Sequence, residues 1–169
     1  MDTNIEIKED ALKTAAQENM AAFIKVFTNK YRETIGGQLS AEKMQLLNGE
    51  QHTLLAYDIL REEMLMGGFC QLIQNGYGSY IFDNPFAKAM RLWGAPEFSK
   101  MVYKAKKIYD AHREDLERER TEEEFMGMYE EYENFDDLDE TFIEEEEQIT
   151  TLIAHYVDKH IEDFAKIVK

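Results

Sequence analysis

One segment, from Glu114 to Glu147, constrains the fold of this chain most, because it is both strongly acidic and regularly apolar. It holds 18 of the 35 acidic residues and only two cations, Arg118 and Arg120. Its net charge of −16 therefore equals that of the whole chain. Apolar residues recur in it at helical spacing, at Phe125, Met128, Tyr129, Tyr132 and Phe135. Disordered acidic tails lack such a stripe, so we expect this acidic segment to form helices that pack on a core.

The remainder of the chain also indicates an all-α fold. Beta-branched runs are scarce, and only two prolines, Pro85 and Pro96, occur in 169 residues. A chain of this length fits one domain. We therefore predict a single compact multi-helix domain over residues 1–169, with about seven to eight helices. The first is expected from about Lys8 to Glu33, and the last is expected to continue through Ile167.

Start and stop signals divide the chain between these two helices. Gly67-Gly68 and Gly94 are expected to end helices, and Asn48-Gly49 is expected to end a short one. The predicted starts are Ser40 as an N-cap, Asn84 as an N-cap with Pro85 in the first helical position, Pro96, and Thr121 with Glu124 as a capping box. The apolar pattern breaks between Asn134 and Asp139, so the last helix is expected to begin near there.

Composition also narrows the location and the classes of partner. The single cysteine, Cys70, cannot form an internal disulfide, and the start MDTNIEIKED lacks the layout of a secretion signal, which indicates the cytoplasm. No apolar run approaches the roughly 18 residues of a membrane-spanning helix. Direct nucleic-acid binding is not expected, because its main affinity term is neutralisation of phosphates by Lys and Arg.

The sequence contains no recognisable catalytic or metal-binding motif. The four histidines lack the spacings of zinc-binding helices. A calcium loop starting at Asp137 would need Gly where Phe142 stands and Glu where Gln148 stands. Cys70 lies in an apolar turn, as expected of an inert buried thiol. We therefore predict no enzyme activity, no cofactor and no specific metal site, while weak divalent binding by the carboxylates stays open.

The charge density of the acidic segment suggests a different role. If its 34 residues were all helical, they would extend about 51 Å, with one net charge per about 3.2 Å. Each strand of duplex DNA carries about one charge per 3.4 Å. One copy of the segment thus resembles a single phosphate strand, and two copies would approach a duplex.

A second feature is the glycine-rich sequence GGFCQLIQNGYG from Gly67 to Gly78, followed by Gly94-Ala95. This pattern resembles the signature of a bacterial family of small, acidic, helical DNA-mimic proteins, and the similarity extends from about Leu54 to the C terminus. The resemblance itself implies a helical fold. Together with the charge of the acidic segment, it also favours a homodimer and a partner that is a helix-turn-helix transcription regulator. The signature residues are Gly67, Gly68, Phe69, Gln71, Asn75, Gly76, Gly78 and Gly94.

The resulting hypothesis is an acidic protein-binding module that occupies the DNA-binding surface of a basic protein. Two alternatives stay open: an immunity or antitoxin-like inhibitor of a basic nuclease toxin, and a helical protein whose acidic residues are merely solvated. Tyr129 and Tyr132 are expected to add specificity between the carboxylates. The predicted partner-binding residues are Glu122, Glu123, Glu130, Glu131, Glu133, Asp136, Asp137, Asp139, Glu140 and Glu144.

Overall fold

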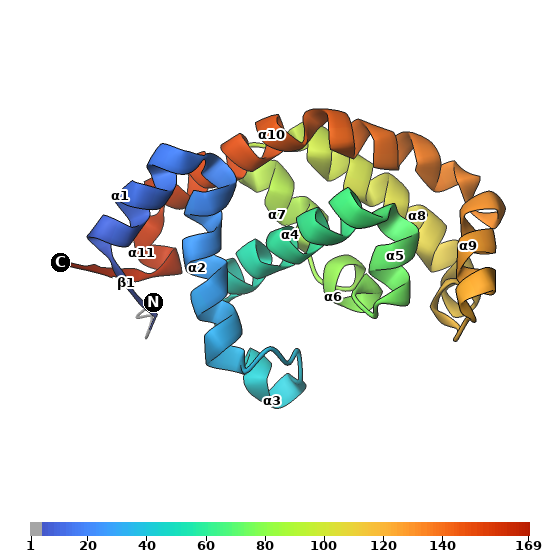
Figure 1. Ribbon diagram of the computed structural model, residues 1–169, viewed down its shortest axis with the longest axis horizontal. Coiled ribbons are helices and arrows are strands. Elements are labelled where there is room, and N and C mark those ends of the chain that lie inside the picture. The colour runs from blue at the N-terminus through green and yellow to red at the C-terminus, as the bar shows by residue number, and fades with distance from the viewer. Residues whose placement is uncertain (1–4) are drawn as a thin grey trace. The chain divides into compact units, whose positions relative to one another are not determined.

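The computed structural model describes residues 5–169, so the first four residues of the MDTNIEIKED start lie outside the described part. In this part there are eleven α-helices, eight of them with seven residues or more (Figure 1). The predicted all-α class is confirmed. The predicted seven to eight helices correspond to the eight helices with seven residues or more. The helices are α1 (Glu9–Glu18), α2 (Met20–Ile35), α3 (Ala41–Met44), α4 (Gly49–Met66), α5 (Gly68–Gln74), α6 (Gly78–Phe82), α7 (Phe86–Leu92), α8 (Pro96–Glu117), α9 (Glu122–Glu131), α10 (Asp136–Lys159) and α11 (Ile161–Phe164).

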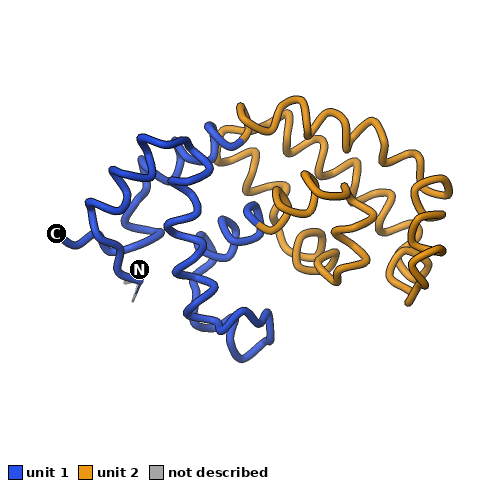
Figure 2. The backbone as a smooth tube through the Cα atoms, in the orientation of Figure 1, with its two compact units in different colours: residues 1–58, 150–169 blue, residues 59–149 orange. Residues whose placement is uncertain are grey.

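The contacts of the chain fall into two compact units (Figure 2). The first unit combines the chain up to Asp58 with Thr150–Lys169, and the second unit is Ile59–Ile149. Helices α4 and α10 each contribute residues to both units. The prediction that residues 1–169 form one domain stays a prediction.

In the first unit, the C-terminal segment pairs with the start of the described chain. Strand β1 (Glu6–Lys8) lies parallel to β2 (Lys166–Val168), with Ile7 opposite Ile167. Nearby, Tyr31 Oη donates a hydrogen bond to the carbonyl oxygen of Phe164 at 2.7 Å. The predicted continuation of the last helix through Ile167 was therefore wrong, because the chain becomes extended once it can pair with β1.

Two asparagines in the first unit act differently from the predictions. Asn19 interrupts the predicted helix over residues 8–33: its backbone is extended, with φ −174°, and its side chain caps α2 by accepting from Ala22 N at 2.8 Å. Asn48 starts α4 instead of ending a helix. Its side chain accepts from Gln51 N at 2.8 Å, and Gln51 Oε1 accepts from Asn48 N at 2.9 Å. An asparagine can thus start a helix where its side-chain oxygen reaches a free backbone N–H.

In the second unit, the glycine-rich sequence forms the turns on either side of α5. Gly68 and Gly76 have φ of 79° and 89°. A Cβ on Gly78 would lie 2.7 Å from the Tyr109 ring, so α6 packs on α8 at a distance that only glycine permits. The ring of Phe69 is buried between those of Phe82 and Phe135, with centroids 6.1 and 5.5 Å away.

The remaining signature residues join α5 to α4 or end α7. The side-chain amides of Gln71 and Asn75 both donate to Glu63 Oε2, at 3.0 and 2.8 Å. Gly94, with φ 97°, follows Trp93, the residue that caps the end of α7, so this helix ends where predicted.

Helix starts were predicted at Asn84 and at Pro96, and the structure agrees with one of them and differs from the other. Pro96 occupies the first turn of α8, as predicted. The prediction for Asn84 was wrong: its side chain donates to the Tyr80 carbonyl oxygen at 2.8 Å, and Pro85 precedes the first helical residue, Phe86. No helix among residues 5–169 is both long enough and apolar enough to cross a membrane.

Candidate protein-binding surface

The acidic segment, Glu114–Glu147, lies within the second unit and folds into the end of α8, the whole of α9 and the first half of α10 (Figure 1). The predicted capping box begins α9. Thr121 Oγ1 accepts from Glu124 N at 3.1 Å, and Glu124 Oε1 accepts from Thr121 N at 3.2 Å. This cap fixes where α9 starts.

The break between α9 and α10 occurs earlier than the sequence indicated. Tyr132 leaves the helical conformation, with φ −116° and ψ 44°, and the 3-10 turn η1 (Glu133–Phe135) follows. Asp136 and Asp137 therefore stand in the first turn of α10, where free backbone N–H groups favour negative charge. The acidic segment consists of two acidic helices joined by a short turn.

The apolar stripe of the acidic segment faces inward and holds both helices on the core. Met128, Phe135 and Phe142 are buried. Tyr129 is half-buried, and its Oη donates to the carbonyl oxygen of Gly67 at 2.8 Å, which ties α9 to the start of α5. Tyr132 is buried and donates to Asp115 Oδ2. Both tyrosines therefore have a structural role, and burial makes Tyr132 unsuitable as a specificity residue between the carboxylates, whereas that role of Tyr129 stays a prediction.

Nine of the ten predicted partner-binding residues are exposed to solvent. They lie on α9, η1 and α10 and comprise Glu122, Glu123, Glu130, Glu131, Glu133, Asp136, Asp137, Glu140 and Glu144.

Asp139 is the exception, because it faces the core of the second unit. Its Oδ1 accepts from Phe69 N at 3.0 Å, beside the Gly68 backbone. Burial, opposed by this hydrogen bond and assisted by the charge of Asp136, raises the pKa of Asp139 to about 6. Asp139 therefore anchors α10 to the glycine-rich turn and does not belong to the exposed set.

Few cations of the described residues neutralise this exposed set. Glu131 lies 3.9 Å from Arg120 Nη1, and this is the one ion pair in residues 5–169 that joins any of the nine to a cation. On α8, Lys100 pairs with Glu97 at 3.2 Å and Lys106 with Asp110 at 2.7 Å, both within that helix. The acidic surface is thus left largely unpaired by the lysines of this chain.

The two arginines of the acidic segment lie between α8 and α9. The Arg120 side chain is fully buried, and its Nη2 donates to the backbone oxygen of Asp115 at 2.8 Å and to Asp115 Oδ2 at 3.0 Å. Arg118 bridges Asp115 and Glu124, at 3.0 Å to each. Hydrogen bonds from Tyr132 and Arg118 hold the pKa of Asp115 below its usual range. These contacts fix the connection between α8 and α9.

The charge density survives the break between the helices. Helix α9 contains five glutamates in ten residues, which is one charge per about 3 Å along its axis. From Asp136 to Glu147, α10 carries eight acidic residues, of which Asp139 and Glu146 are bonded to Phe69 and Arg61. The other six again give one charge per about 3 Å. Each helix alone therefore resembles one phosphate strand in linear charge.

The groups considered for chemistry show no arrangement that would support it. No group of three His, Cys, Asp or Glu residues in the described chain could hold a metal ion. Burial and the nearby carboxylates Asp139 and Asp136 raise the pKa of the Cys70 thiol to about 12. Such a thiol is unreactive near neutral pH, as predicted for Cys70.

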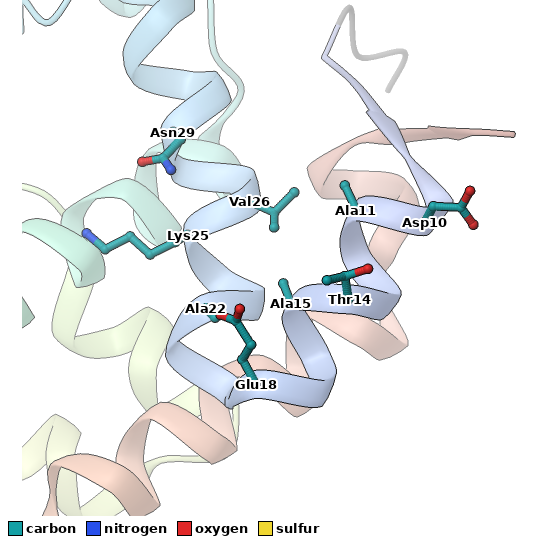
Figure 3. Close-up of a pocket in the computed structure, with 9 residues that line it drawn as sticks. All are labelled: Asp10, Ala11, Thr14, Ala15, Glu18, Ala22, Lys25, Val26 and Asn29. Carbon is teal, nitrogen blue, oxygen red and sulfur yellow. The ribbon is translucent and has the colours of Figure 1, made fainter.

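A second surface feature is a shallow groove between α1 and α2 in the first unit (Figure 3). Small side chains form its floor, and polar residues of both charges surround it, including Asp10, Glu18 and Lys25. Lys25 already bonds Asp58 at 2.9 Å. No predicted site residue lies in this groove, and its mixed charge sets it apart from the acidic segment.

The structure also shows exposed apolar residues that the sequence analysis missed. Met126 on α9 and Ile143 on α10 are 62% and 56% exposed, although both lie among the carboxylates. Met126 falls outside the apolar stripe of α9, so its helical position could have indicated this exposure.

Comparison with known proteins shows which family this chain resembles. The family model described as DMP19-like protein matches residues 45–160, a range that includes the whole acidic segment. A relative from Neisseria meningitidis serogroup B, named DNA mimic protein DMP19, is 32% identical over 152 residues. The aligned region covers 89% of this chain and 92% of that relative.

Proposed function

The chain belongs to the DMP19-like protein family, and on this premise we propose that it is a binding protein whose acidic segment imitates the phosphates of double-stranded DNA. The name of the Neisseria relative, DNA mimic protein, supports mimicry in general. The observation that carries the proposal for this chain is the exposed, largely unpaired set of carboxylates on α9, η1 and α10. Such a set attracts the same cationic surfaces that bind DNA.

Rigid placement of the charge favours mimicry over simple solvation. Solvated acidic residues need no fixed backbone, whereas α9 is held by its capping box and by Tyr129, and α10 is held by Asp139. A DNA-binding surface presents its Lys and Arg side chains at fixed positions, so charges fixed on helices match it with less loss of entropy. The rigid acidic helices therefore support a specific partner.

The proposed partner is a basic DNA-binding protein, namely a helix-turn-helix transcription regulator, and its DNA-binding surface is the part occupied. Regulators of this class place one helix in the major groove and contact the flanking phosphates. A homodimer of this chain would present two sets of acidic helices and bring the total charge closer to that of a duplex. Binding in this way needs no catalysis.

Charge location is the property to test. The test variant replaces Glu130, Glu133, Asp137 and Glu140 by Gln or Asn. The control variant replaces four exposed acidic residues of the first unit, Asp10, Glu18, Glu33 and Glu42, in the same way. Both variants lose four charges, so any difference between them reports where the charge lies.

Each protein is used to capture partners from a lysate of the source bacterium, and the captured protein is then tested for release of labelled duplex DNA. We expect the unmodified protein and the control variant to displace the duplex, with affinity that falls as salt rises, because charge steers the association. We expect the test variant to bind at least tenfold more weakly. Equal binding by both variants would refute the proposal. Capture of a basic nuclease in place of a regulator would mean that the acidic surface inhibits a toxin.

A further inference from the structure

Four large apolar side chains of the second unit are exposed within or beside the acidic helices. Met66 at the end of α4 is 80% exposed and its neighbour Leu65 is 42% exposed; Met126 on α9 and Ile143 on α10 are 62% and 56% exposed. We call them the apolar patch. Single exposed apolar residues are common on protein surfaces, but a group of them indicates an interaction site.

Hydrogen bonds place three of these residues around the Gly67-Gly68 turn. Met66 immediately precedes the turn. Tyr129, three residues after Met126, donates to Gly67 O at 2.8 Å. Asp139, four residues before Ile143, accepts from Phe69 N at 3.0 Å. Residues three and four apart lie close together on a helix, so Met126 and Ile143 lie beside Tyr129 and Asp139, the residues through which α9 and α10 contact this turn.

The pairing of α4 with α10 places Leu65 opposite Ile143. Arg61 of α4 bonds Glu146 of α10, and Phe69, just beyond α4, bonds Asp139. Leu65 lies four residues after Arg61, and Ile143 lies between Asp139 and Glu146 at helical spacing from both. The two side chains are therefore level with each other along the two helices, and both are exposed.

Negative charge surrounds the patch. Glu140 and Glu144 are exposed on α10 next to Ile143, and Glu122, Glu123 and Glu130 are exposed on α9 with Met126. A second copy of this chain is disfavoured as the occupant, because a two-fold interface brings the same surface patch of both copies into contact. Two patches in contact would bring the carboxylates of one copy against those of the other, which costs free energy.

We propose that the apolar patch, together with its ring of carboxylates, binds a basic protein surface on which an apolar side chain stands among lysines and arginines. This inference rests on the proposed function and names what distinguishes its partner from other polycations. Charge alone attracts every polycation. Burial of an apolar side chain increases the affinity only of a partner that carries such a side chain at the matching position. The two methionines suit this role, since their flexible side chains adapt to the shape of a partner.

The test uses two synthetic helical peptides of equal length and equal lysine content. One peptide carries leucines between the lysines, and the other carries glutamines at the same positions. Binding is measured by isothermal titration with the full chain at about 0.15 M salt, where exposed charges are partly screened. We expect the leucine peptide to bind about tenfold more tightly than the glutamine peptide.

The variant Met66→Gln with Met126→Gln and Ile143→Gln should bind both peptides equally. Its matched control is Leu46→Gln with Leu92→Gln and Tyr103→Gln, three exposed residues outside the patch, and this control should keep the tenfold difference. Circular dichroism spectra of both variants identify any loss of fold.

The remaining outcomes separate this inference from the proposed function. Binding of the two peptides with equal affinity by the unmodified protein would overturn the role of the patch but leave the charge-based function intact. Binding of neither peptide would overturn both. If the patch variant changes a dimer into a monomer in sedimentation experiments and still distinguishes the peptides, the patch is covered by a second copy and the inference is wrong.

Discussion

Helices α8 and α10 have similar lengths, 22 and 24 residues, but their charges are compensated in different ways. Helix α8 carries five cations and five acidic residues, and several of them pair along the helix, such as Lys106 with Asp110 and Arg113 with Glu117. Helix α10 carries nine acidic residues and a single lysine, Lys159, in its last turn. Charges that pair along one helix compensate each other, whereas seven of the nine acidic residues of α10 are exposed and that helix offers them a single lysine.

This contrast shows that an apolar stripe and a charged face are independent properties of a helix. Both helices bury aromatic side chains, Phe98 and Tyr109 on α8 and Phe142 on α10. Their packing is therefore comparable, and only the outward residues differ. In α10 the inward carboxylates, Asp139 and Glu146, bond to Phe69 and Arg61 and thereby hold the outward carboxylates in place.

The contrast depends on the contact between α10 and the Gly68 turn, and breaking this contact should have the largest effect. Gly68 has φ 79°, and a Cβ there would lie 2.5 Å from Asp139 Oδ2. We expect Gly68→Ala to lower the free energy of unfolding by about 3 kcal/mol, through backbone strain and displacement of Asp139. Urea unfolding followed by circular dichroism measures the loss.

Gly76→Ala is the matched control for this substitution. Gly76 also has a positive φ, 89°, but nothing lies within 4 Å of its Cβ position. Its loss should be about 1 to 2 kcal/mol, from strain alone. Equal losses in the two variants would show that the contact with Asp139 has no importance for stability.

The pH dependence of stability sharpens the comparison, because Asp139 is an acidic residue of α10 with a strongly raised pKa. Its pKa is about 6 in the fold, against an ordinary value of 3.8, so the folded protein binds this proton more tightly than the unfolded chain. The stability contributed by Asp139 is present below pH 3.8 and is lost as the pH rises to about 6. Asp139→Asn keeps an oxygen for Phe69 N–H and removes the charge.

We therefore expect Asp139→Asn to stabilise the protein by about 1 kcal/mol at pH 7.5 and to have little effect near pH 4. Free energies of unfolding measured for both proteins across this range provide the difference. Asp137→Asn, at an exposed position one turn N-terminal to Thr141, is the control and should show no such pH-dependent gain. A gain that stays constant with pH would contradict the role of the buried charge.

The smallest predicted effect is that removing one charge changes the free energy of unfolding in opposite directions in α8 and α10. Lys106→Gln removes a partner of Asp110 on α8 and should lower the free energy of unfolding by a few tenths of a kcal/mol. Glu140→Gln relieves repulsion from Asp136, Asp137 and Glu144 at helical spacing and should raise it by about the same amount. Differences in urea midpoint at low salt measure both, and added salt should reduce both effects.

The sequence predicted those parts of the fold whose signals are local. The capping box at Thr121, the start of α8 at Pro96 and the end of α7 before Gly94 are all set by residues next to one another. Asn48 was assigned wrongly because asparagine serves at either end of a helix, and the choice depends on which backbone N–H its side chain reaches. The break at Asn19 was missed because the apolar spacing continues across it. The strand β2 was missed because its partner, β1, lies more than 150 residues away in the sequence.

The acidic surface was predicted well as a region and less well residue by residue. Local charge density located the carboxylates, and nine of the ten selected are exposed. Asp139 differs from its neighbours because the backbone N–H of Phe69, seventy positions earlier in the chain, lies opposite it. Tyr129 and Tyr132 likewise find hydrogen-bond acceptors inside the second unit, which no sequence pattern reveals.

The division of the chain into two units has a consequence for its synthesis on the ribosome. The second unit is one continuous stretch, Ile59–Ile149, whereas the first unit needs Thr150–Lys169 to complete it. Tyr31 must wait for the carbonyl of Phe164, and β1 must wait for β2, until the residues after the second unit have been synthesised. The acidic helices can therefore assemble on the nascent chain first, while β1 and α2, although made before them, reach their final structure later.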